Sequence, residues 1–60
     1  MLRIIAHDIV NDIAIIQTSF CFNVRYGLEV TPLDEFQDAL DRFAACQQHA
    51  MQAEFDKEYA

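Results

Sequence analysis

The stretch Phe20-Cys21-Phe22-Asn23-Val24-Arg25-Tyr26-Gly27-Leu28-Glu29-Val30 decides the fold, because it fits two kinds of secondary structure. Every second residue from Phe20 to Val30 is apolar, which is the alternation typical of a strand. Phe20 and Val24 also continue, at helical spacing, an apolar series that begins near the N-terminus. Gly27 is in addition a residue type that commonly ends a helix. The choice between strand and helix therefore depends on the sequence on either side.

The N-terminal flank favours a helix. Its apolar residues recur at intervals of three or four, as Leu2, Ile5, Ile9, Ile13 and Ile16. Strand alternation in the same stretch would place two aspartates among the apolar residues. We therefore expect a helix over residues 2–26, followed by a bend at 27–31.

The C-terminal flank predicts a second, longer helix over residues 32–58. It is rich in Ala, Gln, Glu and Leu, and neither Gly nor a further Pro interrupts it. Thr31 is a suitable N-cap and Pro32 suits a first helical turn. Leu33, Phe36 and Leu40 begin an apolar stripe at helical spacing.

Together these elements predict an all-α fold, in which residues 1–60 form one domain, an antiparallel two-helix hairpin. The chain is 53% hydrophobic, and a chain of 60 residues buries a smaller fraction of its surface than a longer one. Two hairpins that pair as a four-helix bundle would cover both apolar stripes, so we expect a homodimer. The alternative is an α+β fold with a strand near residues 18–30.

The charge balance restricts the possible partners. Four Lys and Arg residues stand against ten Asp and Glu residues, which gives a net charge of −6. This balance argues against nucleic acid and against an anionic membrane surface. No apolar run approaches the roughly 20 residues that cross a bilayer. Two cysteines do not make a disulfide framework, so we expect reduced thiols and a cytoplasmic location.

The acidic residues concentrate at the start of the second predicted helix, as Asp34, Glu35, Asp38 and Asp41. Acidic side chains at this position complement the helix dipole and can be no more than a solvated face. They can also form a docking face for a basic protein partner. The function we favour is therefore a small acidic, non-catalytic regulatory or protein-interaction module that acts as a homodimer and binds a partner not yet identified.

One polar constellation on the first predicted helix suggests chemistry. His7, Asp8 and Asn11 lie on the side of that helix away from the isoleucines. An imidazole can act as a nucleophile, and a neighbouring carboxylate can orient it or accept its proton. The plainer interpretation is a solvated helix face.

The box His7-Asp8-x-x-Asn11, followed by Ile13-Ala14-Ile15-Ile16, resembles the phosphoacceptor box of the dimerisation and histidine-phosphotransfer domain of sensor histidine kinases. The resemblance implies that His7 accepts a phosphoryl group, that Asp8 is a general base and that Asn11 helps to position water. Asp12 departs from the family, which often has proline or an apolar residue there. The chain has no Gly-rich nucleotide motif, so a histidine-phosphotransfer module is the alternative function rather than a kinase.

Cys46 and His49 are the remaining candidates for chemistry, because they lie three residues apart on the second predicted helix. A structural zinc site needs four ligands, and no further pair of ligands can be assumed to converge on these two. We therefore expect no metal site and no cofactor.

Overall fold

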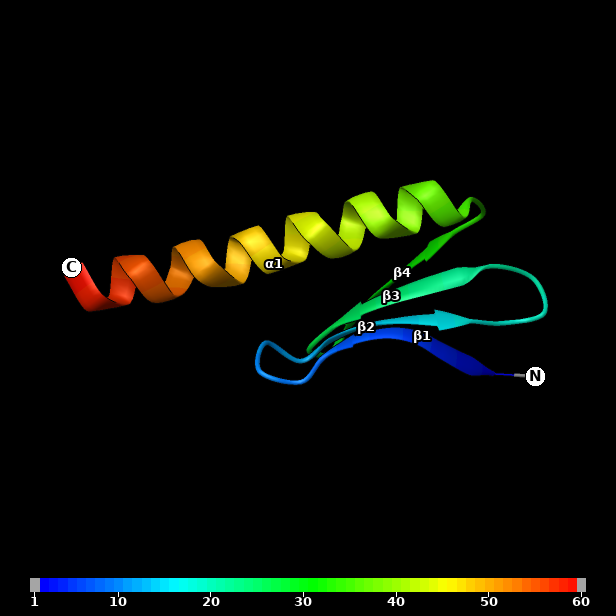
Figure 1. Cartoon of the computed structure of the whole chain (residues 1–60), viewed down its shortest axis with the longest axis horizontal. Coiled ribbons are helices and arrows are strands. Elements are labelled where there is room, and N and C mark those ends of the chain that lie inside the picture. The colour runs from blue at the N-terminus through cyan, green and yellow to red at the C-terminus, as the bar shows by residue number, and fades with distance from the viewer. Residues whose placement is uncertain (1, 60) are drawn as a thin grey trace.

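The computed structural model describes residues 2–59, and the side chains as far as residue 57. It contains four strands and one helix, β1 (Arg3–Asp8), β2 (Ile13–Gln17), β3 (Phe22–Tyr26), β4 (Glu29–Leu33) and α1 (Phe36–Tyr59). The strands form an antiparallel sheet in the order β1-β2-β3-β4, and α1 packs across one face of it (Figure 1). The fold is therefore α+β, with two layers.

The all-α prediction is wrong, and so is the helix expected over residues 2–26. The alternation in the central stretch is the pattern that the chain follows, because Phe22, Val24 and Tyr26 all face the helix from β3. Phe20 precedes β3 in a loop and is 94% exposed. The bend expected at 27–31 is a tight turn followed by most of β4, so residues 2–59 form neither the helical hairpin nor the half of a four-helix bundle that was expected.

Gly27 ends a strand rather than a helix. Tyr26 pairs with Glu29, which leaves Gly27 and Leu28 as a two-residue hairpin loop between β3 and β4. Gly27 has a φ of 61°, and Leu28 does not have a positive φ. A positive φ at the first central residue alone is the sign pattern of a type II′ turn, in which glycine is preferred and whose twist suits an antiparallel hairpin.

The turn between β1 and β2 achieves a similar reversal without glycine. Asp8 pairs with Ile13, so residues 9–12 form the loop. Asp12 takes the left-handed conformation there, with a φ of 56°. Aspartate and asparagine tolerate this conformation better than other non-glycine residues. The apolar residues of this loop, Ile9 and Val10, are largely exposed, and this is why the helical spacing of the N-terminal isoleucines misleads.

The core lies between the helix and the two central strands. The only large side chains with less than 2% exposure in the described part of the chain are Ile13, Ile15 and Val24. Ala39 and Cys46 of α1 pack against these side chains and complete the core on the helix side. Small residues on the buried face of α1 let the helix lie close to the sheet.

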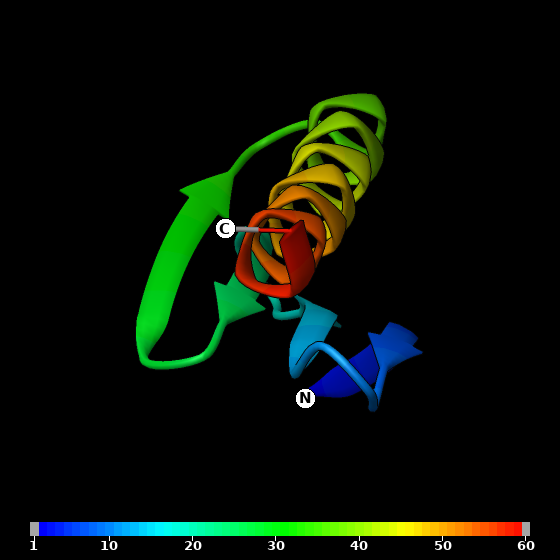
Figure 2. The same ribbon diagram turned by 90° about the vertical axis from the view of Figure 1, so that its left-hand side faces the viewer.

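The helix is much longer than the layer it covers. It begins at Phe36 instead of residue 32, because Thr31 and Pro32 belong to β4. Its 24 residues span roughly 36 Å, whereas a strand of five residues spans roughly 17 Å. The C-terminal half of α1 therefore projects beyond the sheet, past the end where the β1–β2 and β3–β4 turns lie (Figures 1 and 2).

Within residues 2–59, no helix has both the length and the apolar character needed to cross a membrane.

Candidate interaction surface

The main feature of the surface is the amount of apolar side chain that the fold leaves uncovered. Eleven large hydrophobic residues among those described are exposed, against three that are fully buried. They are Leu2, Ile4, Ile9, Val10, Phe20, Leu28, Val30, Phe36, Leu40, Met51 and Phe55. Single exposed apolar residues are ordinary, but a contiguous apolar area on a small protein marks an interaction site.

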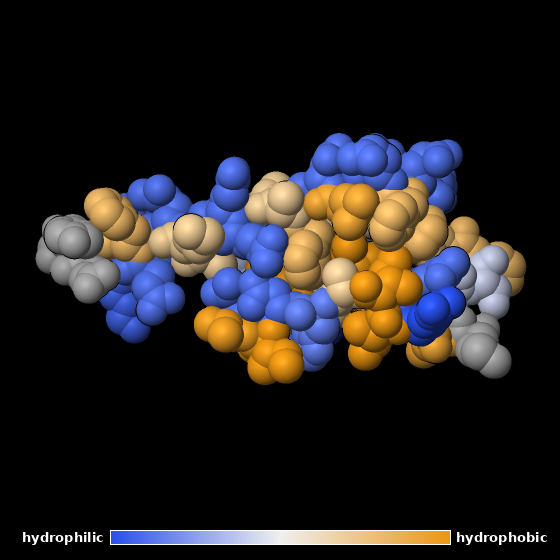
Figure 3. All heavy atoms as spheres, viewed as in Figure 1, coloured by the Kyte–Doolittle hydropathy of each residue, from blue (hydrophilic) through white to orange (hydrophobic). Residues whose placement is uncertain are grey.

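Seven of these residues lie in two regions of the molecule. One lies at the end of the molecule where the helix projects, and it includes Ile9, Val10 and Leu28 from the two turns, with Met51 and Phe55 on the helix. Figure 3 shows hydrophobic side chains at this end, below the projecting helix. The other region follows β1, where Leu2 precedes the strand and Ile4 lies within it, 73% and 62% exposed.

The two turns at this end are held together by Arg25. Its guanidinium donates a hydrogen bond to Asp12 Oδ1 at 2.9 Å and another to the carbonyl oxygen of Gly27 at 2.9 Å. The Gly27 amide in turn donates to the Asp12 carbonyl at 3.0 Å. The hydrogen bond and the charge of Arg25 lower the pKa of Asp12. These hydrogen bonds fix the two turns relative to each other, and they therefore also fix the positions from which the exposed apolar residues project.

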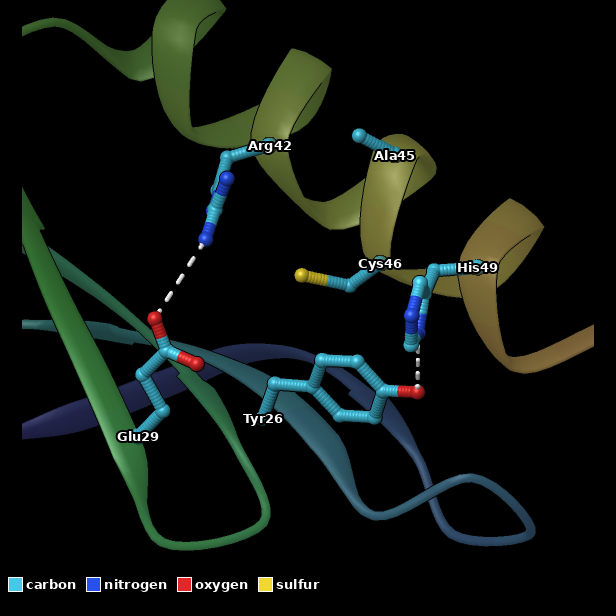
Figure 4. A pocket seen from close by; sticks show the side chains of 6 residues that line it. All are labelled: Tyr26, Glu29, Arg42, Ala45, Cys46 and His49. Carbon is cyan, nitrogen blue, oxygen red and sulfur yellow. Dashed lines mark hydrogen bonds and ion pairs between the residues drawn. The ribbon is translucent and has the colours of Figure 1, made fainter. Parts of the chain in front are cut away.

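A shallow pocket of about 230 Å³ lies between the β3–β4 turn and α1. Figure 4 shows Tyr26 and Glu29 on the strand side, with Arg42, Cys46 and His49 on the helix side. The Tyr26 hydroxyl and His49 Nδ1 are hydrogen-bonded at 3.1 Å, and the two rings meet edge to face. Arg42 and Glu29 form a long, partly exposed ion pair at 3.7 Å.

This pocket has little capacity for catalysis. Cys46 is 4% exposed, and the hydrogen bond of His49 goes to Tyr26 rather than to a carboxylate that would orient it. Its volume is also below the roughly 300 Å³ at which small-molecule sites begin. Among the described residues, no three His, Cys, Asp or Glu side chains are grouped as metal ligands.

The structure brings together only two of the three residues of the proposed phosphoacceptor box. Asn11 donates to both oxygens of Asp8, from its backbone at 3.2 Å and from its side chain at 2.8 Å. Gln47 of α1 donates to Asp8 Oδ2 at 3.0 Å, so Asp8 points to the helix side of the sheet. His7 is its neighbour on a strand, where successive side chains point to opposite faces, and it is exposed on the other face.

Asp8 is thus part of the turn and of the contact between sheet and helix. The hydrogen bonds from Gln47 and Asn11 lower its pKa, because they stabilise the carboxylate. These roles are structural, and they place the carboxylate on the opposite side of the sheet from the imidazole of His7.

Only two of the four acidic residues proposed for partner binding lie on the helix that was expected to carry them all. Asp34 and Glu35 precede α1, whereas Asp38 and Asp41 lie in its first two turns, and all four are exposed. Asp41 accepts a hydrogen bond from Gln37 at 3.2 Å. Hydrophilic side chains line the outer edge of the helix over these turns (Figure 3). Because α1 covers one face of the sheet, its acidic residues lie on the opposite side of the molecule from the uncovered face of the sheet.

The chain matches no protein-family model, no curated protein and no solved structure. The resemblance to the dimerisation and histidine-phosphotransfer domain of sensor histidine kinases is not supported, because that domain is a helical hairpin and this chain has four strands. The box is a short coincidence of residue types across the end of β1 and its turn.

Sequence reasoning missed the contacts that join distant residues. The bond between Tyr26 and His49 spans 23 positions and that between Asp8 and Gln47 spans 39. The strand alternation places Tyr26 on the same face as Val24, but nothing in the sequence pairs it with His49. The role of Arg25 is similarly invisible, since it depends on two turns that meet only in the folded sheet.

Proposed function

We propose that this chain is a small acidic, non-catalytic protein-interaction module that acts as a homodimer in the cytoplasm. One observation carries the proposal, namely that three large side chains are fully buried while eleven are exposed. A domain of 60 residues has a total stability of about 3–9 kcal/mol, so its small core leaves little margin. A partner that covers the exposed apolar residues adds the burial that the single chain lacks.

The cytoplasmic location is supported by the two cysteines. Cys21 lies in the β2–β3 loop and Cys46 in the core on α1, and both are free thiols. Free thiols persist in reducing compartments.

Self-association is tested by sedimentation equilibrium and by thermal unfolding over a hundredfold range of protein concentration. We expect a dimer mass and a Tm that rises with concentration, because a ligand or subunit that binds only the folded state stabilises it by mass action. A monomer mass with a Tm independent of concentration would contradict the proposal.

The acidic helix start is the surface that we propose for a second partner, a basic protein. Asp34, Asp38 and Asp41 have no cation within ion-pair distance among the described residues, so their charge is available to such a partner. Their like charges around the start of α1 raise the association rate of a basic surface and make that rate sensitive to salt.

Affinity capture compares the wild type with an Asp38→Lys/Asp41→Lys variant. A matched control reverses two acidic residues of the projecting helix, Glu54→Lys and Asp56→Lys. We expect the first variant to lose basic binding proteins in a salt-dependent manner, and the control to retain them. Equal losses in both variants would show that only net charge matters.

A further inference from the structure

Strand β1 is an uncovered edge of the sheet. It is first in the strand order, so only β2 pairs with it within the chain. The backbone of α1 lies over β2, β3 and β4, whereas β1 lies to one side and is joined to the helix by the hydrogen bond from Gln47 to Asp8 (Figure 2). An edge strand carries a row of backbone donors and acceptors that can pair with another strand.

The opposite edge carries a proline and β1 does not. Pro32 is the fourth of the five residues of β4 and removes a backbone donor from that edge. Strand β1 contains no proline, and its middle, Ile4-Ile5-Ala6, is entirely apolar. The side chain of Ile4 and that of Leu2, which directly precedes the strand, are mostly exposed. Of the two edges, β1 is the one suited to pairing.

The charges of β1 are incompletely matched within the chain. Arg25 has Asp12 at 2.9 Å and Arg42 has Glu29 at 3.7 Å, but Arg3 has no acidic partner within the described residues. Asp8 accepts hydrogen bonds only from amides, and no cation contacts it there. A free guanidinium and a carboxylate without a cation therefore lie at the two ends of the same strand.

A bulge in β1 places these two groups on the same face. Arg3 pairs with Gln17 and Asp8 with Ile13, and both of these β2 residues belong to the face that carries Ile15. The register shifts between Ile4 and Ala6, so the strand contains one extra residue. In a regular strand, residues 3 and 8 would point to opposite faces, because five positions separate them.

We propose that a second copy of this chain pairs with β1 in antiparallel orientation, with Arg3 opposite the partner's Asp8 and Ile4 opposite the partner's His7. This inference rests on the proposed homodimer and specifies its interface. A two-fold axis normal to the sheet, at Ile5 and Ala6, relates the two strands. Facing residues then share a face, as an antiparallel ladder requires, and each dimer contains two Arg3–Asp8 pairs.

The two four-stranded sheets become one continuous eight-stranded sheet, with both helices on the same face. Because α1 does not cover β1, the two helices stand apart and neither obstructs the pairing. The Arg3–Asp8 pairs also place attraction at the join between two chains that each carry a charge of −6.

The test exchanges the charges. Arg3→Asp places two aspartates opposite each other twice per dimer, and Asp8→Arg does the same with two arginines. Since facing like charges are destabilising, we expect each variant alone to dimerise with a Kd raised by roughly tenfold or more. A mixture of the two variants restores both pairs, so it should form a heterodimer as tight as the wild type. The matched control is Arg42→Asp, which lies on the helix and should leave the Kd unchanged.

Cross-linking tests the register without altering Asp8, which also holds the turn. In a Cys21→Ser background, Ile4→Cys and His7→Cys variants are mixed under mild oxidation. Facing residues in an antiparallel pair have Cα atoms about 4.5–5.5 Å apart, within the range of a disulfide. We expect a disulfide-linked dimer in the mixture and little in Ile4→Cys alone, where the two cysteines are on non-facing positions.

The possible outcomes distinguish the proposed homodimer from the proposed β1 interface. A monomeric wild type overturns both the homodimer and its interface. The β1 interface is wrong, although the homodimer is right, if the wild type is a dimer and the charge variants dimerise with an unchanged Kd. The same conclusion follows if the mixture of charge variants does not regain the wild-type Kd and the mixture of cysteine variants gives no mixed disulfide. Restoration in the mixture together with the mixed disulfide supports the interface as described.

Discussion

Replacement of Ile15 by alanine tests the packing of this small core most directly. Ile15 is fully buried on β2 between the sheet and α1. The substitution removes three carbon atoms, which at about 0.8 kcal/mol each corresponds to about 2.4 kcal/mol of lost transfer free energy. The cavity that remains raises the usual cost of such a change to about 2–5 kcal/mol. Against a total of about 3–9 kcal/mol for 60 residues, this change removes much of the stability.

Ile9→Ala is the matched control, because it removes the same atoms from a residue that is 79% exposed in the β1–β2 loop. A surface change of this kind alters stability by about 0.5 kcal/mol or less. If residues 2–16 formed a helix instead, Ile9 would lie on the buried stripe and Ile15 outside it, so Ile9→Ala would cost more stability than Ile15→Ala. The pair of substitutions therefore discriminates between the sheet and the helix.

The assay is urea unfolding followed by far-ultraviolet circular dichroism, with every variant at the same protein concentration so that self-association affects each one equally. Ile15→Val is included because it costs only about 0.5–1.5 kcal/mol and keeps the protein folded. Equal destabilisation by Ile9→Ala and Ile15→Ala, or a greater effect of Ile9→Ala, would refute the assignment of the core.

Three further predictions concern the turn, the carboxylates and the thiols. Gly27→Ala should destabilise the protein by about 1–2 kcal/mol in the same urea assay, because its φ of 61° is unfavourable for alanine although nothing lies within 4 Å of an added Cβ; an unchanged midpoint would contradict the turn geometry. Hydrogen bonds lower the pKa of Asp8 and Asp12 below 3.8, so their contribution to stability is present above about pH 4 and is lost as the pH falls through the lowered values; acid titration of the unfolding free energy should show this loss, and a gain of stability below pH 4 would exclude it. Cys21 should react with a thiol reagent in the folded protein and Cys46 only after unfolding, which thiol counting with and without urea would check; immediate reaction of both would contradict the burial of Cys46.

Part of this fold is readable from the sequence, and the central stretch shows how. The alternation through Phe22, Val24 and Tyr26 correctly indicates one buried face of a strand, and Gly27 correctly indicates a reversal of the chain. What misleads is the N-terminal segment, where a turn carries Ile9 and Val10 in place of polar residues. Its positive φ falls on Asp12 instead of a glycine, so the usual signs of a turn are weak.

The interaction surfaces depend on information that local patterns do not contain. The spacing of Asp38 and Asp41, three residues apart, reveals a common face because a helix is regular. The common face of Arg3 and Asp8 arises from one extra residue in β1, and a bulge of this kind is a property of strand pairing rather than of local composition. Exposure of the β1 edge likewise follows from where the helix lies.

The excess length of α1 divides the helix into two parts with different resistance to opening. The first part carries Ala39, Phe43 and Cys46 against the sheet, so its amides should exchange with solvent deuterium only when the whole domain unfolds. The projecting part, with Met51 and Phe55, has no sheet beneath it, and a few unsupported turns of helix are marginal in water. Amide protection should therefore fall stepwise along the helix after Ala50. A partner that binds the projecting part would be recognised by the disappearance of that step.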